Sequence, residues 1–434
     1  MPGEAFRFPD GFVWGCSTAA HQVEGQNFNN DWWDWEQAGG KIKHGHSSRL
    51  ACDWWGGRYR GDFERARALG ANALRFSLEW SRLEPREGEW DKEATRTYRD
   101  MLRALRDVGL APLVTLHHFT NPRWFMAQGG WERPAAVEQF RRFAGRAARE
   151  LGDLCDWWVT INEPNVYATL CYAVGEWPPQ RRGLRPALNV FKHMLQAHAA
   201  AYRALKERQP EGRVGLAHHW RHFAPHRRAS PLDQLAARWR DRFFNGLALA
   251  ALYTGALAVP FMGRAEMAGV RGAHDFIGLN YFVGETTAFD VSRPVELFGR
   301  AVLDADAQKW KPMFAAASRP RPDGLESALR RLARFDRPIY VTENGIFDAG
   351  DGSQADYLIS HLQAVQSGLQ AGVPVGGYFW WTLVDNFEWS EGFGPRFGLY
   401  HLDHDSQRRT ARPVAEAFAR IIRENMITSE MLRR

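Results

Sequence analysis

The chain has 434 residues, of which 45% are hydrophobic and 24% charged, and its formal net charge is +6. This length excludes a single small domain and suits either two ordinary domains or one large α/β barrel with long insertions. The basic residues are spread along the chain, so neither composition nor charge favours nucleic-acid binding.

Cysteine usage and hydropathy set further limits. The chain has no CxxC pair, and this predicts four reduced core thiols in a cytosolic protein, at Cys16, Cys52, Cys155 and Cys171. The first ten residues contain no apolar run, so we expect no secretory signal and a cytoplasmic location. Residues 247–262 are too short and too interrupted to span a bilayer, and they are predicted to form a buried helix.

Apolar runs of strand length recur along the chain and alternate with segments of helical periodicity. Nearly continuous apolar runs indicate strands that are covered on both faces, and therefore parallel pairing. Helices are predicted at 98–108, at 137–151, and from the cap-like segment 353–356 to Gly372. The eight predicted strands are 12–15, 73–78, 112–116, 157–161, 214–217, 276–279, 339–342 and 375–381.

Eight such strand–helix units predict a single (β/α)8 TIM barrel domain over residues 1–434, because no linker or repeat divides the chain. Two of the βα connections are long, at about 164–189 and about 281–322. Extended βα loops lie on the catalytic face of such a barrel and usually carry substrate selectivity.

Two of the predicted strands end in a glutamate. Glu163 lies where an apolar run stops and precedes Pro164, which is expected to hold Glu163 in an extended conformation. Glu343 directly follows the run 339–342. A carboxylate at the end of a buried strand costs free energy unless it is paired or used. One such residue could be a structural ion pair, but two would face each other in a parallel barrel.

Other polar and aromatic residues also fall at strand ends, and together they predict a pocket on one face of the barrel. Two carboxylates are the minimal requirement for glycoside hydrolysis, with one protonated and the other ionised. Arg75 near Glu343 would keep Glu343 ionised, while a drier setting would keep Glu163 protonated. The 19 tryptophans indicate either an aromatic core or a surface that stacks sugar rings. These further strand-end residues are Gln22, Arg75, His118, Asn162, Asn280, Trp381, Glu388 and Trp389.

From Phe8 to about Ile422 the sequence resembles glycoside hydrolase family 1, the β-glucosidase group. Any one of the matching segments is weak, but all of them in this order are very specific. They are Phe12-Val13-Trp14-Gly15, Gln22-Val23-Glu24-Gly25, Arg75-Phe76-Ser77-Leu78-Glu79-Trp80, Thr160 to Pro164, Asn280-Tyr281, Thr342 to Gly345 and Asp385-Asn386-Phe387-Glu388-Trp389.

The resemblance implies a retaining β-glycosidase in which Glu163 is the general acid/base and Glu343 the nucleophile. It also implies that Arg75 and Asn280 orient Glu343 and that Trp381 is a platform under the non-reducing sugar. The hydroxyls of that sugar would be bound by Gln22, His118, Asn162, Glu388 and Trp389. No metal or organic cofactor is implied, and the partners would be small β-glycosides or oligosaccharides.

The chain departs from the family pattern in three places. Phe119 replaces a tryptophan after the histidine, and Phe282 replaces a tyrosine whose hydroxyl contacts the nucleophile in the family. The chain is also slightly short, which predicts trimmed loops and an acceptor side that could favour transglycosylation. Tyr167, Trp177 and Trp310 in the long loops could stack on the aglycone or be ordinary packing.

Glu388 argues against a phosphorylated sugar, because its carboxylate would repel phosphate. The sequence does not separate glucose, galactose and fucose, and it gives no oligomeric state. One alternative class is a metal-dependent hydrolase using the tandem histidines at 117–118 and 218–219, although successive side chains on a strand point to opposite faces. Another is a non-catalytic sugar-binding protein on the same barrel, which would typically have lost one glutamate.

Overall fold

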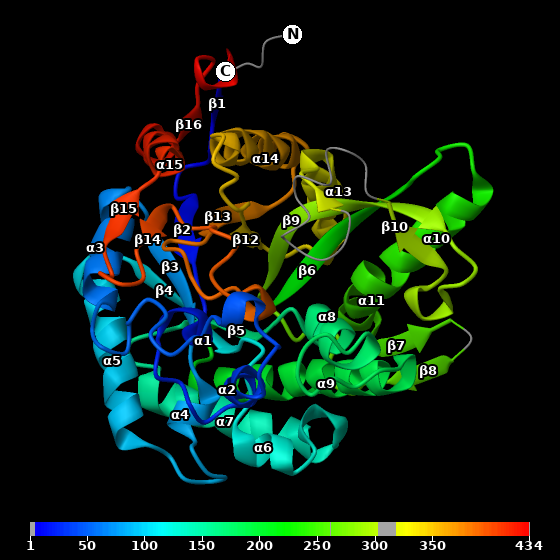
Figure 1. Ribbon diagram of the computed structural model, residues 1–434, viewed down its shortest axis with the longest axis horizontal. Helices are drawn as coiled ribbons and strands as arrows, with labels where there is room; N and C mark the ends of the chain where they lie inside the picture. The colour runs from blue at the N-terminus through cyan, green and yellow to red at the C-terminus, as the bar shows by residue number, and fades with distance from the viewer. Residues whose placement is uncertain (1–4, 261, 303–317, 434) are drawn as a thin grey trace.

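A closed barrel of parallel strands forms the centre of the molecule in the computed structural model, which describes residues 5–260, 262–302 and 318–433 (Figure 1). Each strand pairs in parallel with the next, and β13 pairs with β2 to close the ring. The prediction of a (β/α)8 barrel is therefore confirmed. Its strands are β2 (Val13–Ser17), β3 (Ala73–Ser77), β4 (Ala111–His117), β5 (Trp157–Asn162), β6 (Arg213–Pro225), β9 (Phe276–Phe289), β12 (Ile339–Asn344) and β13 (Val375–Trp381).

Helices connect the strands on the outside of the barrel (Figure 1). The three helices predicted from the sequence are present; two match the expected ends within two residues, whereas the one predicted at 98–108 begins six residues earlier, at Lys92. The outer helices are α3 (Tyr59–Ala68), α5 (Lys92–Asp107), α7 (Ala135–Leu151), α9 (Leu184–Arg208), α10 (Pro231–Asp241), α11 (Leu247–Thr254), α13 (Pro322–Leu332), α14 (Ser353–Gln370) and α15 (Pro413–Glu424).

Shorter elements lie in the connections and at the chain ends. The short helices are α1 (Ala20–Val23), α2 (Asp31–Gln37), α4 (Trp80–Leu83), α6 (Arg123–Ala127) and α8 (Pro164–Tyr167). The additional strands are β1 (Phe6–Arg7), β7 (Ala256–Val259), β8 (Gly263–Glu266), β10 (Gly299–Ala301), β11 (Ser318–Arg319), β14 (Tyr400–Leu402), β15 (Arg409–Ala411) and β16 (Met426–Ile427). Because β1 pairs with β16, the two ends of the described chain lie side by side.

The core has two parts, as expected for a barrel whose strands are buried on both faces. Inside the barrel Trp157 packs against Phe276, Tyr340 and Phe379, which fills the end away from the site. A larger cluster fills the space between the strands and the outer helices. The four cysteines are buried and unpaired in these layers, which confirms that they are core thiols.

Two predictions need correction. The buried helix expected over residues 247–262 ends at Thr254, and the segment continues as β7, which pairs with β8 in a hairpin. The helix ends there because Gly255 adopts the left-handed conformation that closes a helix. Strands β6 and β9 are also far longer than predicted, and they remain paired in parallel out to Pro225 and Thr287. None of the helices in the described ranges is long and apolar enough to cross a membrane.

Candidate active site

Glu163 lies at the corner where β5 turns into α8. The prediction of an extended Glu163 is wrong, because the residue is left-handed, with φ 48° and ψ 57°. Its N–H donates to the Ala217 carbonyl at 2.8 Å, and its carbonyl accepts from Tyr167 N–H at 3.0 Å. These two bonds offset the strain of a left-handed residue that is not glycine, which is typical of functional corners.

A change of register brings Glu343 into the barrel. Tyr340 points inward, so strict alternation would direct residue 343 outward, but the pairing of β12 with β9 shifts between Val341 and Glu343. As a result Glu343 makes an ion pair with Arg75, whose side chain is fully buried on β3. The same guanidinium donates to Asn162 Oδ1 at 2.7 Å, and β5 has a matching irregularity between Val159 and Asn162.

Glu163 has different partners from Glu343. Its Oε1 accepts from Asn280 Nδ2 at 2.8 Å and lies 2.8 Å from His219 Nδ1. The amide of Asn280 is oriented by Thr342, whose hydroxyl donates to Asn280 Oδ1 at 2.6 Å. Asn280 also hydrogen-bonds Glu343, so this one side chain links the two glutamates. The structure therefore brings Glu163, Glu343, Arg75, Asn162 and Asn280 together, as the sequence predicted.

Burial has a large electrostatic effect on this cluster. Burial is the largest cause of a net rise in the pKa of Glu343 to about 8; Arg75 opposes this rise, and the nearby charge of Glu163 adds to it. The expectation that Arg75 alone keeps Glu343 ionised is therefore too simple. Of the charged groups around Glu343, the guanidinium of Arg75 is the one that favours the ionised form of this carboxyl.

Gln22 and Glu388 meet on the opposite side of the strand-end cluster. Gln22 Nε2 donates to Glu388 Oε2 at 3.2 Å and to the Phe387 carbonyl at 2.9 Å. Burial and the charge of Glu343 raise the pKa of Glu388 to about 8, while hydrogen bonds from Trp381 and Gln22 lower it. Gln22 Oε1 is buried without a hydrogen-bond partner among the described residues, which leaves it available to a ligand hydroxyl.

His118 and the tryptophans form an aromatic wall beside these polar groups. The His118 ring is nearly parallel to Trp381, with centroids 5.9 Å apart, and to Trp389, with centroids 6.2 Å apart. His118 Nε2 lies 3.2 Å from Asn162 Nδ2. Burial, Arg75 and His117 hold the pKa of His118 well below its usual range, so His118 is a neutral hydrogen-bonding group here.

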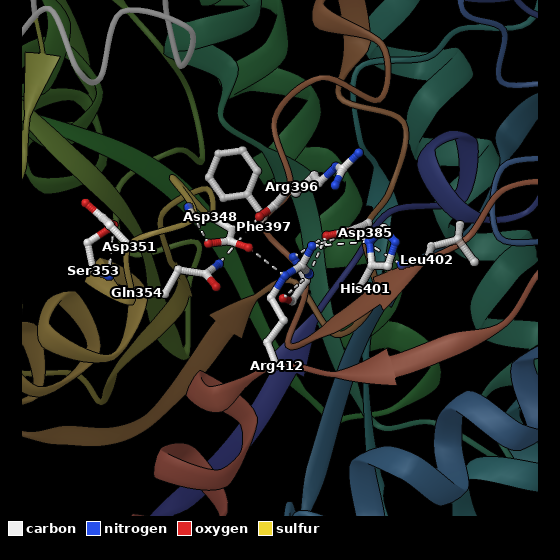
Figure 2. A network of polar contacts seen from close by, with 12 residues as sticks. Asp348, Asp351, Ser353, Gln354, Asp385, Arg396, Phe397, His401, Leu402 and Arg412 are labelled. Atoms are coloured by element: carbon white, nitrogen blue, oxygen red, sulfur yellow. Dashed lines mark hydrogen bonds and ion pairs between the residues drawn. The ribbon is translucent and has the colours of Figure 1, made fainter.

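A buried ion pair braces the loop 382–399, which carries Glu388 and Trp389 (Figure 2). Both carboxylate oxygens of Asp385 accept from the Arg412 guanidinium, at 2.9 and 2.8 Å. Arg412 also donates to Asp348 at 3.1 Å, in the loop that follows Glu343. The network therefore ties the loops after β12 and β13 to the start of α15.

Gly345 joins the same two loops at closer range. A Cβ atom on Gly345 would overlap the carbonyl oxygen of Trp381, so the chain after β12 can approach Trp381 only through a glycine.

The residues at which the chain departs from the family pattern are part of the packing around the site. Phe119 contacts Trp177 and Trp389 at centroid distances of 5.1 and 5.2 Å, and Phe282 stacks on His219 at 5.8 Å. Trp177 also packs against Trp32, and Tyr167 is fully buried, so these two loop aromatics are packing residues in this structure. Trp310 lies outside the described residues.

The tandem histidines do not converge. His117 faces Asn121, at 3.1 Å, and Trp131, whereas His118 faces the site. Among the residues with described positions, no three His, Cys, Asp or Glu side chains are grouped to hold a metal ion. A separate cavity of about 390 Å³ between β6, α10 and α13 is lined by Trp220, Arg238 and Arg331, and it does not include the two glutamates.

The sequence reasoning missed His219 as a neighbour of Glu163, because it considered this residue only as a metal ligand. A usable signal was present, since His219 follows the predicted strand 214–217 at the same end of the barrel as the other polar strand-end residues.

A closed parallel barrel whose strand ends bring two glutamates together beside amides and tryptophans defines the class of barrel hydrolases that act on glycosidic bonds. Residues 4–427 match the family described as Glycosyl hydrolase family 1. The chain therefore belongs to glycosyl hydrolase family 1, and its resemblance to that family is confirmed.

The chain is similar to known relatives over nearly its whole length. It is 29% identical to Beta-glucosidase A of Thermotoga maritima, over 96% of this chain and 98% of the relative. It is 28% identical to a beta-galactosidase of Pyrococcus woesei, over 98% of both chains. The solved beta-glycosidase from Pyrococcus horikoshii superposes with a TM-score of 0.89 at 35% identity, covering 99% of this chain and 98% of the other.

Proposed function

We propose that the protein is a retaining β-glycosidase that hydrolyses terminal non-reducing β-D-glucosides and also accepts β-galactosides and β-fucosides. The observation that carries this proposal is the unequal environment of two joined glutamates. Glu343 contacts the permanent cation Arg75, whereas Glu163 contacts an amide and an imidazole. Such an arrangement suits one ionised nucleophile and one proton donor.

The proposed mechanism is a double displacement. The non-reducing sugar binds over Trp381, with its hydroxyls on Gln22, His118, Asn162, Glu388 and Trp389. Glu343 attacks the anomeric carbon while Glu163 protonates the departing oxygen, and water deprotonated by Glu163 then hydrolyses the glycosyl-enzyme. These steps use only side chains of this protein. A carboxyl separation of about 5–5.5 Å is typical of retaining enzymes.

The relatives' names support the glycone assignment, because they include both beta-glucosidases and beta-galactosidases. We infer that the chain acts as one catalytic unit, since the family match spans residues 4–427. The four unpaired cysteines support a reducing compartment, and we propose the cytoplasm. We retain no non-catalytic alternative, because both glutamates and Arg75 are in place.

Azide rescue tests the mechanism and assigns the two roles. With Glu163→Ala, azide should restore turnover of an activated aryl β-glucoside and give the β-glycosyl azide, because the covalent intermediate still forms. With Glu343→Ala, azide should give the inverted α product. Swapped products would reverse the assignment, and a wild-type enzyme that turns over no aryl β-glycoside would refute the proposed function.

A further inference from the structure

We propose that His219 is a positioning residue for the general acid/base, which holds Glu163 through Oε1 so that Oε2 carries the proton to the leaving group. This inference rests on the proposed function. His219 Nδ1 and Asn280 Nδ2 both lie 2.8 Å from the same oxygen of Glu163. The side chains of His219 and Glu163 are 3% and 7% exposed, so water competes little for this contact.

The surroundings fix the imidazole in this position. Phe282 lies nearly parallel to the His219 ring, with centroids 5.8 Å apart, and Phe244 meets the ring edge-on at 5.6 Å. The backbone of β6 is paired with β9 at this point, where His219 lies opposite Asn280. The two groups that reach Glu163 Oε1 therefore come from adjacent positions on neighbouring strands.

The two oxygens of Glu163 have different roles in this arrangement. Asn280 donates an N–H to Oε1, and His219 donates its Nδ1–H to the same atom. With Oε1 engaged twice, the acidic proton resides on Oε2. During glycoside cleavage the leaving oxygen takes that proton, and the carboxylate that remains is stabilised by the two N–H groups on Oε1.

Substitutions that keep or remove the Nδ1 donor test this role. His219→Phe keeps a ring between Phe282 and Phe244 but removes the nitrogens. His219→Gln places an amide near the position of Nε2, and His219→Asn places one near Nδ1. A matched control is His218→Phe, because His218 is a buried neighbour on the opposite face of β6.

The readout is kcat/KM on two substrates. Phenyl β-D-glucoside needs a proton on its leaving group, whereas dinitrophenyl β-D-glucoside departs without one. We expect His219→Phe and His219→Gln to lose about 10- to 100-fold on the phenyl glucoside and under about 3-fold on the dinitrophenyl glucoside. His219→Asn should recover most of the loss, and His218→Phe should show no difference between the substrates.

The outcomes separate this inference from the proposed function. Equal losses on both substrates would show a general structural role and overturn the inference. A His219→Asn enzyme as selectively impaired as His219→Gln would also overturn it, as would full activity of both. Circular dichroism and thermal unfolding identify any variant that fails to fold, and the Asn and Gln variants then still discriminate. Failure of the wild type on both glucosides would instead refute the proposed function.

Discussion

Replacing Arg412 with methionine should destabilise the protein by leaving a buried carboxylate unpaired. Asp385 is 3% exposed, and both of its oxygens accept from Arg412. Without the guanidinium, Asp385 retains the backbone N–H groups of Gly398 and Leu402, at 2.9 and 3.2 Å, and the contact with His401 Nδ1 at 3.1 Å, but it has lost its nearest permanent cation. Removing one partner of a buried ion pair costs about 3–5 kcal/mol, much of it from the uncompensated charge.

Because the protein is large, this loss of unfolding free energy corresponds to a modest change in melting temperature. The entropy of unfolding is about 2.1 cal/mol/K per residue, or about 0.9 kcal/mol/K for a chain of 434 residues. Arg412→Met should therefore lower the apparent Tm by about 3–5 °C, measured by calorimetry at one fixed scan rate. The KM for a β-glucoside should also rise, because the loop 382–399 carries Glu388.

A double variant and a surface control test whether the loss of stability comes from the unpaired buried charge. Arg412→Met combined with Asp385→Leu leaves no buried charge in the pair and should regain much of the lost stability, so the two changes should not add. Arg96→Met removes a pair whose side chains are 64% and 76% exposed, and its Tm should change by about 1 °C or less. The reasoning is refuted if Arg412→Met melts like the wild type, or if the double variant loses the sum of the two single losses.

Three further predictions concern the ionisable groups and Phe282. Because the pKa of Glu343 is raised to about 8, chiefly by burial, its ionised form becomes more populated as the pH rises towards 8. On dinitrophenyl β-D-glucoside, whose leaving group needs no proton, kcat/KM should therefore rise over that range, and a flat profile counts against the raised pKa. The pKa of Glu388 is raised from its ordinary 4.5 to about 8, so its contribution to stability is present at low pH and is lost as the pH rises from about 4.5 to 8. The Tm of Glu388→Gln should therefore fall less than the Tm of the wild type across that range. Parallel curves of Tm against pH would contradict this. Phe282→Tyr should shift the pH–rate profile of kcat/KM by adding a hydroxyl near the glutamates, and an unchanged profile would contradict the idea that Phe282 deprives Glu343 of a hydrogen bond.

The sequence predicted the barrel well because its strands are covered on both faces. Runs such as Pro112–Leu116 are apolar at all but one position, so they can be located without knowledge of the fold. The outer ends of β6 and β9 were missed because these parts lie beyond the barrel core. Their residues mix polar and apolar types, and only the pairing of one strand with the other identifies them as strands.

The sequence predicted that Glu163 and Glu343 would meet, but it did not predict their local geometry. Glu163 and Glu343 stand out because a carboxylate ends an apolar run. Their inward direction, however, depends on register shifts in β5 and β12, and the left-handed backbone of Glu163 depends on hydrogen bonds to Ala217 and Tyr167. These features arise from contacts between distant segments, and a local pattern such as the proline after Glu163 predicts the opposite conformation.

The difference between the two glutamates follows from what lies between them. Asn280 bonds both carboxyls, and Arg75 reaches both Glu343 and Asn162, so a layer of amides and one cation separates two groups that are chemically identical. The cation touches only Glu343, whereas the donors on Glu163 converge on a single oxygen and leave the other free. These contacts favour the charged form at Glu343 and, under the proposed mechanism, leave the other oxygen of Glu163 to carry the proton. This asymmetry arises from side chains on β3, β6 and β9, not from the glutamates themselves. Under the proposed mechanism, a substitution at Arg75 should therefore impair nucleophilic attack, whereas one at His219 should impair proton transfer to the leaving group.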